Sequence, residues 1–326
     1  MIDIKEKPFK TLDQQIEILE KRGLHIDDKE YARYFLITRN YYSMINDYGK
    51  FFTKSSDVYI ENVTLKDIDN VYNFDKAIKS ILYTHLLEVE KHLKSALAYC
   101  FCVNHQDTFS YLSVQSYKCD NSSDVLLSTD VISRISKVIK DYNADSKSPN
   151  AIKHYFKKYN GVPLWVVIQF MYFGDVIKMY KSCDDGTQNE VAKVFSNFIR
   201  QNTEEQTAIL TSGCLYKILC QEKEIRNCIA HNNKILNTNV NKSIPYIPTI
   251  HDPLNIKPDC ARADVYNSFI AMKCLISKTE YANLHNSIRK RIYHLSKSLN
   301  CISYKKIITS LGFPEDWLEK NPKIQQ

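Results

Sequence analysis

The chain has 326 residues, 44% hydrophobic and 25% charged, a composition that excludes a disordered chain and allows one large domain or two smaller ones. With only 7 glycines and 9 prolines it has too few turn-forming residues for a many-stranded sandwich or a doubly wound sheet, so we expect an all-α fold. The formal net charge of +7 is compatible with a polyanionic partner but does not require one.

Two helices that pack as a hairpin are expected near the N-terminus. Thr11 begins a capping-box pattern, and the short helix that follows it ends at Gly23. Asp27 or Asp28 caps a second helix, which we expect to bend near Asn40.

The strongest helical pattern follows this hairpin. Between Thr64 and about Val103, apolar residues recur with the period of an α-helix. The next segment, 107–150, is rich in serine and aspartate, and we interpret it as an insertion or a peripheral hairpin with one helix at 125–142.

Helices are expected over most of the remaining sequence. The expected ranges are 163–182, 187–200, 203–221, 222–233, 260–278 and 280–299. Between them, residues 237–259 hold four prolines within 14 residues, which indicates an extended connection. The expected domain division is an N-terminal helical region, 1–60, packed on a larger helical domain, 61–326.

Several classes of protein are disfavoured by what the sequence does not contain. The ten cysteines include no Cys-x-x-Cys pair, so we expect a reduced, cytoplasmic protein. The first ten residues have no apolar signal-peptide region, and the longest apolar stretch, 162–177, contains Gln169 and Asp175, so neither secretion nor membrane insertion is expected.

Phosphate-binding loops, dinucleotide-binding fingerprints, nucleophile elbows and zinc-type cysteine or histidine spacings do not occur in the sequence, so we expect no cofactor and no metal. Two pairs of acidic residues, Asp67 with Asp69 and Glu88 with Glu90, are interpreted as parts of solvated helix faces.

The stretch "KEIRNCIAHNNKILN" at 223–237 contains Arg226, Asn227 and His231 on a predicted helix. Histidine transfers protons near neutral pH and arginine stays charged, so the two together can support cleavage of RNA by its own 2′-hydroxyl. Asn227 and His231 lie about 40° apart around a helix, whereas Arg226 lies about 140° from His231. A two-fold dimer would gather two copies of each residue into one cleft.

The Arg-x(4–6)-His pattern is weak by itself, because chance alone predicts on the order of one match in a chain of this composition. A second match runs from Arg289 to His294, in a basic run with Arg291, and we interpret it as a surface or RNA-contacting helix face.

Other basic and aromatic residues have two interpretations. Three lysines around the first match could follow an RNA backbone or simply be solvated: Lys217, Lys223 and Lys234. Three tyrosines could stack on RNA bases, but packing in the core is the expected role: Tyr41, Tyr42 and Tyr48.

Four blocks of the sequence occur in the order "KPFKTLDQQIEILEKRGLHIDDKEYARYFLITRNYYSMINDYGKFF", "NFDKAIKSILYTHLLEVEKHLKSALAY", "VPLWVVIQFMYFGDVIKMY" and "IRNCIAHNNKILN". Together, and in this order, they resemble abortive-infection (Abi) proteins of the AbiD/AbiF type, which have a C-terminal HEPN domain. This resemblance implies a HEPN-like helical bundle, a ribonuclease site formed across a homodimer, and a role in phage defence or toxin–antitoxin control. Some relatives are partnered by a small structured RNA.

The resemblance also implies roles for single residues. His231 would transfer protons, Arg226 would contact the phosphate, and Asn227 would orient either one. Glu90 matches an acidic position that holds Arg226 or the histidine, although it can equally be an exposed partner of Lys94 on its own helix. Gln169 stands where the family pattern has an acid, so electrostatic support from that position is expected to be missing.

Three hypotheses follow for the function. The first is a metal-independent HEPN endoribonuclease of a defence system. The second is a non-catalytic RNA-binding or regulatory HEPN protein in complex with a small structured RNA. The third is a helical scaffold that binds only proteins.

Overall fold

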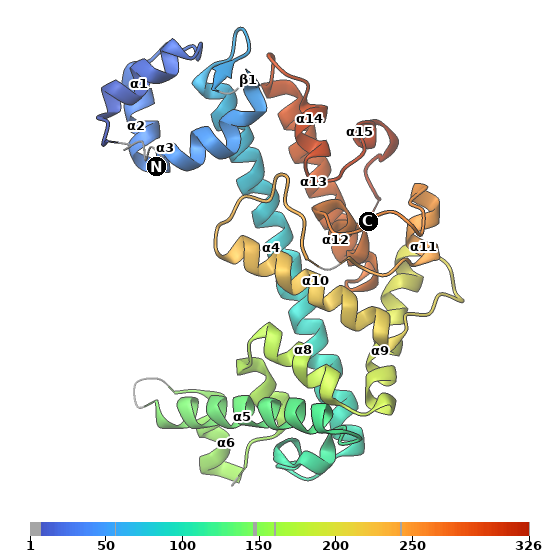
Figure 1. The fold of residues 1–326 in the computed structure, drawn as a ribbon. Helices are drawn as coiled ribbons and strands as arrows, with labels where there is room; N and C mark the ends of the chain where they lie inside the picture. The colour runs from blue at the N-terminus through green and yellow to red at the C-terminus, as the bar shows by residue number, and fades with distance from the viewer. Residues whose placement is uncertain (1–7, 56, 146–148, 160, 242, 326) are drawn as a thin grey trace, which may run out of the picture. The chain divides into compact units, whose positions relative to one another are not determined.

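The computed structural model describes residues 8–55, 57–145, 149–159, 161–241 and 243–325 (Figure 1). Within these ranges the protein is helical apart from one antiparallel two-stranded hairpin, β1 (Thr53–Ser55) with β2 (Val58–Tyr59). The expected all-α fold is therefore confirmed. None of the helices in the described ranges combines the length and the apolar composition that a bilayer span needs.

The chain is divided into two compact units. Unit 1 consists of Met1–Ile81, Lys234–Thr238 and His285–Ile324, and unit 2 consists of Leu82–Asn233, Asn239–Leu284 and Gln325–Gln326. Two long helices have residues in both units, α4 (Leu65–Asn104) and α13 (Lys278–Ser298). The expected division into 1–60 and 61–326 stays a prediction.

Unit 1 begins with the expected helical hairpin. Besides parts of α4 and α13, its elements are α1 (Leu12–Lys21), α2 (Lys29–Arg39), α3 (Tyr41–Ser43), η1 (Met44–Tyr48), η2 (Gly49–Phe52), β1, β2, α14 (Tyr304–Thr309) and α15 (Trp317–Lys320). Thr11 and Gln14 form the expected capping box, and Asp28 caps α2. At Asn40 a φ of 59° separates α2 from α3, which confirms the expected break.

A buried carboxylate lies in the core of unit 1. Asp75 on α4 accepts hydrogen bonds from the Tyr48 hydroxyl at 2.9 Å and from the backbone N–H of Ile235 at 3.0 Å. The ammonium of Lys79, one turn along α4, lies 3.1 Å from the same carboxylate. Burial and the charge of Asp75 raise the pKa of Tyr48, so the phenol stays protonated and remains a donor. Asp75 therefore joins α4 to η1 and to the segment 234–238.

The acidic pair Asp67 and Asp69 is also buried, so the expected solvated helix face is wrong for these two residues. Asp67 accepts hydrogen bonds from the N–H and hydroxyl of Thr64 at the start of α4. Asp69 accepts a hydrogen bond from Tyr31 at 2.7 Å and pairs with Arg39. Local capping and contacts with α2 bury these carboxylates, and helical periodicity alone did not reveal either.

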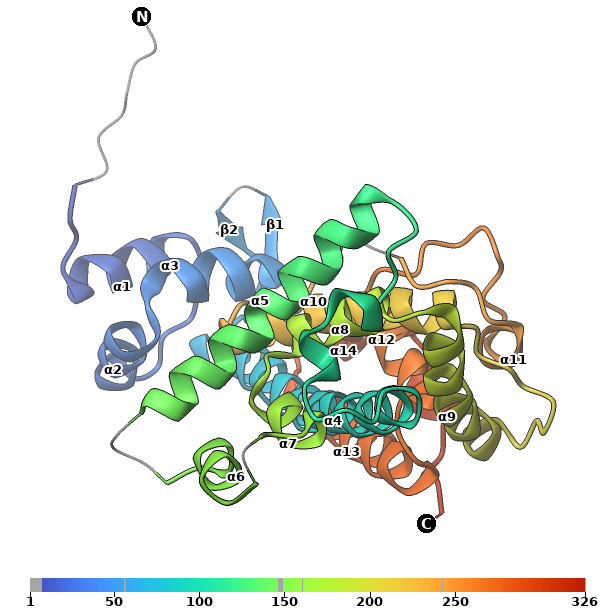
Figure 2. The same ribbon diagram turned by 90° about the horizontal axis from the view of Figure 1, so that it is seen from below.

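Unit 2 contains the remaining elements, shown from a second direction in Figure 2. They are η3 (Ser110–Leu112), η4 (Val114–Ser116), α5 (Ser122–Ala144), α6 (Ala151–Tyr159), α7 (Leu164–Val167), η5 (Ile168–Phe170), α8 (Phe173–Ser182), α9 (Asp185–Thr203), α10 (Ser212–Ala230), α11 (Pro248–His251), η6 (Asp252–Leu254), α12 (Val265–Ala271) and η7 (Met272–Cys274). Helix α10 packs against α8, α9 and α12.

Two predicted helix boundaries in unit 2 are wrong. The single helix expected at 163–182 is interrupted, because Met171 and Tyr172 have extended backbones between η5 and α8. The helices expected at 203–221 and 222–233 are instead one helix, α10, which begins only after Thr211. Gln221 and Glu222 are both fully buried in its middle, so this polar pair does not mark a helix end.

The segment 107–150 is part of unit 2 and consists mainly of one helix. Helix α5 contains the predicted helix 125–142 and packs on α8. Arg134 lies 3.0 Å from Asp175, and Lys178 lies 2.8 Å from Asp130, so two ion pairs connect α5 with α8. Residues 146–148 of its serine-rich end lie outside the described ranges.

We expected the proline-rich connection at 237–259 to be extended, and it is extended only in part. It contains the short elements α11 and η6, each with a proline in its first turn, where the missing N–H is harmless. Residue 242 of this connection lies outside the described ranges. The ten cysteines are all free thiols in this structure.

Candidate functional site

Helix α10 carries the Arg-x(4)-His pattern and is fixed in unit 2 by its apolar face. Thr211 caps its first turn by accepting a hydrogen bond from the N–H of Cys214. Five aliphatic side chains along the helix are buried: Leu215, Ile218, Leu219, Ile225 and Ile229. This packing decides which way the polar residues between them point.

Arg226 points toward α4 in unit 2. Its Nη2 lies 3.9 Å from Oε2 of Glu90, and its Nη1 donates a hydrogen bond of 3.4 Å to the side-chain oxygen of Asn227. The Nε of Arg226 and the Oε2 of Glu90 are both buried without a hydrogen-bond partner. The side chain of Arg226 is 25% exposed, so a phosphate can reach the guanidinium only at atoms other than the buried Nε, next to a carboxylate that restrains its position.

Glu90 has both of the partners that the sequence suggested. Its Oε1 lies 2.8 Å from Nζ of Lys94, one turn further along α4, and Lys94 also donates to the backbone carbonyl of Gln169 at 3.3 Å. The side chains of Glu90 and Lys94 are only 13% and 8% exposed, so the pair is not on a solvated face. One carboxylate shared by Lys94 and Arg226 leaves this cluster with a net positive charge.

Gln169 is exposed in η5 and reaches the cluster only through its backbone carbonyl. No carboxylate is supplied from this position, as the sequence indicated.

His231 lies at the C-terminal end of α10 and is exposed. Its backbone N–H donates to the carbonyl of Asn227 at 3.0 Å. Within the described ranges, its imidazole makes no hydrogen bond and no ion pair, so both ring nitrogens are available to a substrate. Because Arg226 lies about 140° away around the helix axis, one copy of α10 does not bring the guanidinium and the imidazole together.

The other predicted RNA-binding residues differ in availability. Lys217 is exposed and Lys223 is half-buried on α10. Lys234, in unit 1, lies 3.1 Å from the backbone carbonyl of Asp47 and 3.7 Å from its carboxylate, so its charge is partly balanced.

The second Arg-x(4)-His match lies on the part of α13 that belongs to unit 1. Arg289 donates to the backbone carbonyls of Asn321 at 2.8 Å and Leu318 at 3.2 Å, which fixes the C-terminal segment and occupies the guanidinium. Arg291 and His294 are exposed. This arrangement favours a surface role for the second match.

The expected packing role of the tyrosine cluster holds for one of its members. Tyr48 is buried, Tyr41 is half-buried, and Tyr42 is 70% exposed on α3. Tyr42 is therefore the member whose ring is open to a base.

Sequence reasoning did not single out Glu222, which is fully buried one turn before Arg226 on α10. Its Oε2 accepts a hydrogen bond of 2.5 Å from Ser268 on α12, whereas its Oε1 has no partner. Burial raises the pKa of Glu222 to about 8. In the sequence, a buried glutamate such as Glu222 differs from an exposed one in no visible way. It shows only as a polar residue that interrupts an apolar pattern.

Comparison with known proteins identifies the chain at the level of a family. A family model described as "Abi-like protein" matches residues 34–237, which is more than half of the chain. The chain belongs to the Abi-like family. The search of curated proteins and the search of solved structures returned no match.

The family match supports the expected resemblance to abortive-infection proteins, and membership of the Abi-like family suggests a function in phage defence. The matched region includes Glu90, Lys94 and the segment 226–231, whereas Arg289 and Arg291 lie beyond its end.

Proposed function

We propose that this Abi-like protein is a HEPN-type endoribonuclease that cleaves RNA without a metal ion, using Arg226, Asn227 and His231 from two copies of the chain. The observation that carries the proposal is the state of the two charged groups on α10. His231 is exposed with no protein partner for its ring, and Arg226 keeps unused donors beside Glu90. A buried polar atom with only a structural role usually has its hydrogen bonds satisfied, which the Nε of Arg226 does not, and the exposed imidazole of His231 is open to a substrate.

The chemistry needs only these groups and the RNA. One imidazole takes the proton of a 2′-hydroxyl, whose oxygen attacks the adjacent phosphorus. The guanidinium of Arg226 stabilises the added negative charge on the pentacoordinate phosphorus. A second imidazole protonates the departing 5′-oxygen, so the products are a 2′,3′-cyclic phosphate and a 5′-hydroxyl. Asn227, which accepts a hydrogen bond from Arg226, orients the guanidinium.

The need for a second copy follows from the helix geometry. Arg226 points toward α4, whereas His231 extends from the end of α10 in a direction about 140° away. A homodimer with two-fold symmetry places the same helix twice at one interface, so each copy contributes an arginine and a histidine to a shared cleft. We propose this dimer as the active form, in the cytoplasm, with RNA as the substrate.

The local charge supports RNA as the ligand. Among the residues that the structure describes, Lys94 and Arg226 pair with the one carboxylate of Glu90, and Lys223 is a further cation on α10. A net positive cluster attracts a phosphate backbone, and this attraction weakens with added salt.

One observation favours the second candidate function, a regulatory HEPN protein that holds a small structured RNA, for example in a toxin–antitoxin pair, without cleaving it. Gln169 stands where an acid is expected, and the structure supplies no carboxylate from that position. In this case Arg226 and Lys223 would grip RNA, and His231 would have no proton to transfer.

The test uses the purified full-length protein and a single-stranded RNA in the presence of EDTA. We expect cleavage that leaves 2′,3′-cyclic phosphate ends and that is lost in His231→Ala. His294→Ala is a matched control, because His294 is also an exposed histidine in an Arg-x(4)-His pattern. Cleavage that needs added metal, or that survives His231→Ala, contradicts the nuclease. Binding without cleavage by both variants and the unaltered chain supports the regulatory function, and the absence of RNA binding favours a protein-binding scaffold.

A further inference from the structure

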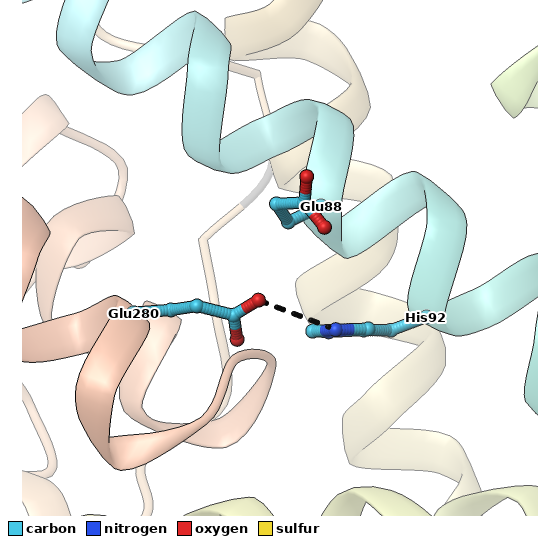
Figure 3. A group of neighbouring side chains, drawn as sticks. All are labelled: Glu88, His92 and Glu280. Carbon is cyan, nitrogen blue, oxygen red and sulfur yellow. Dashed lines mark ion pairs between the residues drawn. The ribbon is translucent and has the colours of Figure 1, made fainter.

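A histidine and two glutamates converge in unit 2 away from the α10 motif. Glu88 and His92 lie one turn apart on α4, and Glu280 comes from the first turn of α13 (Figure 3). One potential ligand atom from each of the three lies within 4.8 Å of the other two. The Nε2 of His92 and the Oε1 of Glu280 are 3.5 Å apart.

The ring of His92 is oriented as in many metal-binding histidines. Its Nδ1 lies 3.1 Å from the backbone carbonyl oxygen of Leu275. A carbonyl oxygen can only accept, so Nδ1 carries the hydrogen and Nε2 is the atom that faces the carboxylates. Phe198 stacks on the ring with centroids 5.0 Å apart and restrains it further. A backbone acceptor on one nitrogen that leaves the other for a metal is the usual second-sphere arrangement.

The two carboxylates each have one oxygen already engaged. The N–H and hydroxyl of Ser277 donate to Oε2 of Glu280 at 2.8 and 2.7 Å. Burial opposes ionisation of Glu280, but these hydrogen bonds and the nearby histidines outweigh it and lower its pKa. Lys91 lies 3.1 Å from Oε2 of Glu88. The remaining oxygen of Glu280, Oε1, faces the imidazole of His92.

We propose that Glu88, His92 and Glu280 bind a divalent first-row transition-metal ion, such as Zn²⁺, that fastens α4 to the start of α13. A neutral imidazole directs its Nε2 lone pair at a carboxylate oxygen, a repulsive arrangement that either a metal ion between the two atoms or a proton on Nε2 relieves. A metal about 2.1 Å from both Nε2 and Oε1 would subtend an angle of about 113° at their separation, close to tetrahedral. One imidazole with two carboxylates suits such ions better than Mg²⁺ or Ca²⁺, which take oxygen ligands.

Two further features fit this site. Glu88 is 36% exposed at its side chain, so it can rotate toward the other two ligands when an ion binds. His85 lies one turn before Glu88 on the same face of α4 and is close enough to affect Glu280, so water or His85 completes the coordination.

The metal would not take part in RNA cleavage. Glu90 follows Glu88 by two residues, so the two side chains lie about 160° apart around α4, on nearly opposite faces. EDTA is therefore expected to remove the metal without stopping RNA cleavage. Failure of the metal-site proposal would leave the nuclease proposal untouched, and the reverse also holds.

The competing interpretation is an ion pair between a protonated His92 and Glu280, with no metal. The test strips the full-length protein with EDTA, removes the chelator, and titrates Co²⁺ while visible absorption is recorded. We expect one Co²⁺ per chain, with d–d bands and no thiolate charge-transfer band, and displacement by Zn²⁺. The thermal unfolding midpoint should rise with bound Zn²⁺, since an ion that binds only the folded chain stabilises it.

Two ligand variants and one control separate the outcomes. His92→Gln and Glu88→Gln should each weaken Co²⁺ binding at least ten-fold, and the more exposed Glu88 guards against a variant that fails to fold. Lys91→Met removes the ammonium that competes for Glu88 but no ligand, so its affinity should be equal or higher. The proposal is overturned by an absence of saturable binding, by a thiolate charge-transfer band that assigns the ion to cysteines, or by unchanged affinity in both ligand variants.

Discussion

The carboxylate of Glu90 lies between two cations, 2.8 Å from Lys94 on its own helix and 3.9 Å from Arg226 on α10. The shorter contact is a close ion pair, and the longer one is a looser ion pair. Arg226 is thus restrained by charge, while its hydrogen bond to the side-chain oxygen of Asn227 is long, at 3.4 Å. This is the condition under which an arginine can be held in place and still bind a phosphate.

Replacement of Glu90 by glutamine should destabilise unit 2 and weaken cleavage. Two little-exposed cations would lose their common counter-charge, which costs about 2–4 kcal/mol by comparison with other broken buried pairs. Urea unfolding measures the stability, and cleavage of the single-stranded RNA measures the activity, which should fall about ten-fold.

The double variant Glu90→Gln with Lys94→Met is the control for this effect. The double variant removes one of the two cations that lost their counter-charge, so it should be more stable than Glu90→Gln alone. Unfolding of Glu90→Gln at the same urea concentration as the unaltered protein would show that Glu90 is not part of the cluster.

A shared active site predicts complementation between two inactive variants. A heterodimer of one Arg226→Ala chain and one His231→Ala chain, purified with two different tags, keeps one intact arginine and one intact histidine in the shared cleft. We expect RNA cleavage above that of either homodimer but well below that of the unaltered protein, because one imidazole remains and water must replace the other in the proton transfer. If each chain formed its own site, the heterodimer would have no complete site and would be as inactive as its parents. A heterodimer of two differently tagged His231→Ala chains is the control.

The sequence was sufficient for the long elements whose signals are local. The apolar period of α4, the capping box at Thr11 and the cap at Asp28 all depend on residues close together in the chain, and each was confirmed. The break between η5 and α8 at Met171 and Tyr172 was missed, because an apolar run keeps its helical appearance when the backbone becomes extended.

The candidate site was accessible to sequence reasoning only in part. Arg226, Asn227 and His231 lie within six positions, so their spacing could be read directly. The contact from Glu90 to Arg226 required a family resemblance, and the cluster of Glu88, His92 and Glu280 combines residues far apart in the chain. Contacts of this kind depend on how helices pack, which no spacing rule contains.

Glu222 should make stability depend on pH. Burial raises its pKa from 4.5 to about 8 in the folded state, so the folded chain holds a proton that the unfolded chain releases. The resulting contribution is fully present below pH 4.5 and is lost as pH rises through about 8, with a total change of about 3–5 kcal/mol as an upper range. Urea midpoints measured from pH 5.5 to 8.5 should fall with rising pH.

The variant Glu222→Gln separates this group from all other titrating groups. The amide keeps the shape of the neutral carboxyl and still accepts the hydrogen bond from Ser268, so the fall between pH 5.5 and 8.5 should become much shallower. An identical pH slope in the unaltered protein and in Glu222→Gln would assign the dependence to other residues.

Asp75 should be among the residues on which unit 1 depends most. In Asp75→Asn, the buried ammonium of Lys79 loses the carboxylate that lies 3.1 Å from it, and an NH₂ group faces the N–H of Ile235 or the hydroxyl of Tyr48. We expect a loss of about 2–4 kcal/mol in the free energy of unfolding, because a buried ion pair is broken and a buried donor loses its acceptor.

The matched comparison is Asp67→Asn, which changes another buried aspartate on α4. Asp67 accepts hydrogen bonds from the N–H and hydroxyl of Thr64 and interacts with the thiol of Cys301, and the side-chain oxygen of asparagine can also accept from such uncharged donors, so its replacement should cost less than about 1 kcal/mol. The free energy of unfolding of both variants is measured by urea unfolding under the same conditions. Equal losses would mean that the effect comes from replacing a buried aspartate on α4, whatever its partners. A larger loss in Asp75→Asn would instead locate the stability in the contacts that join α4 to Tyr48 and Ile235.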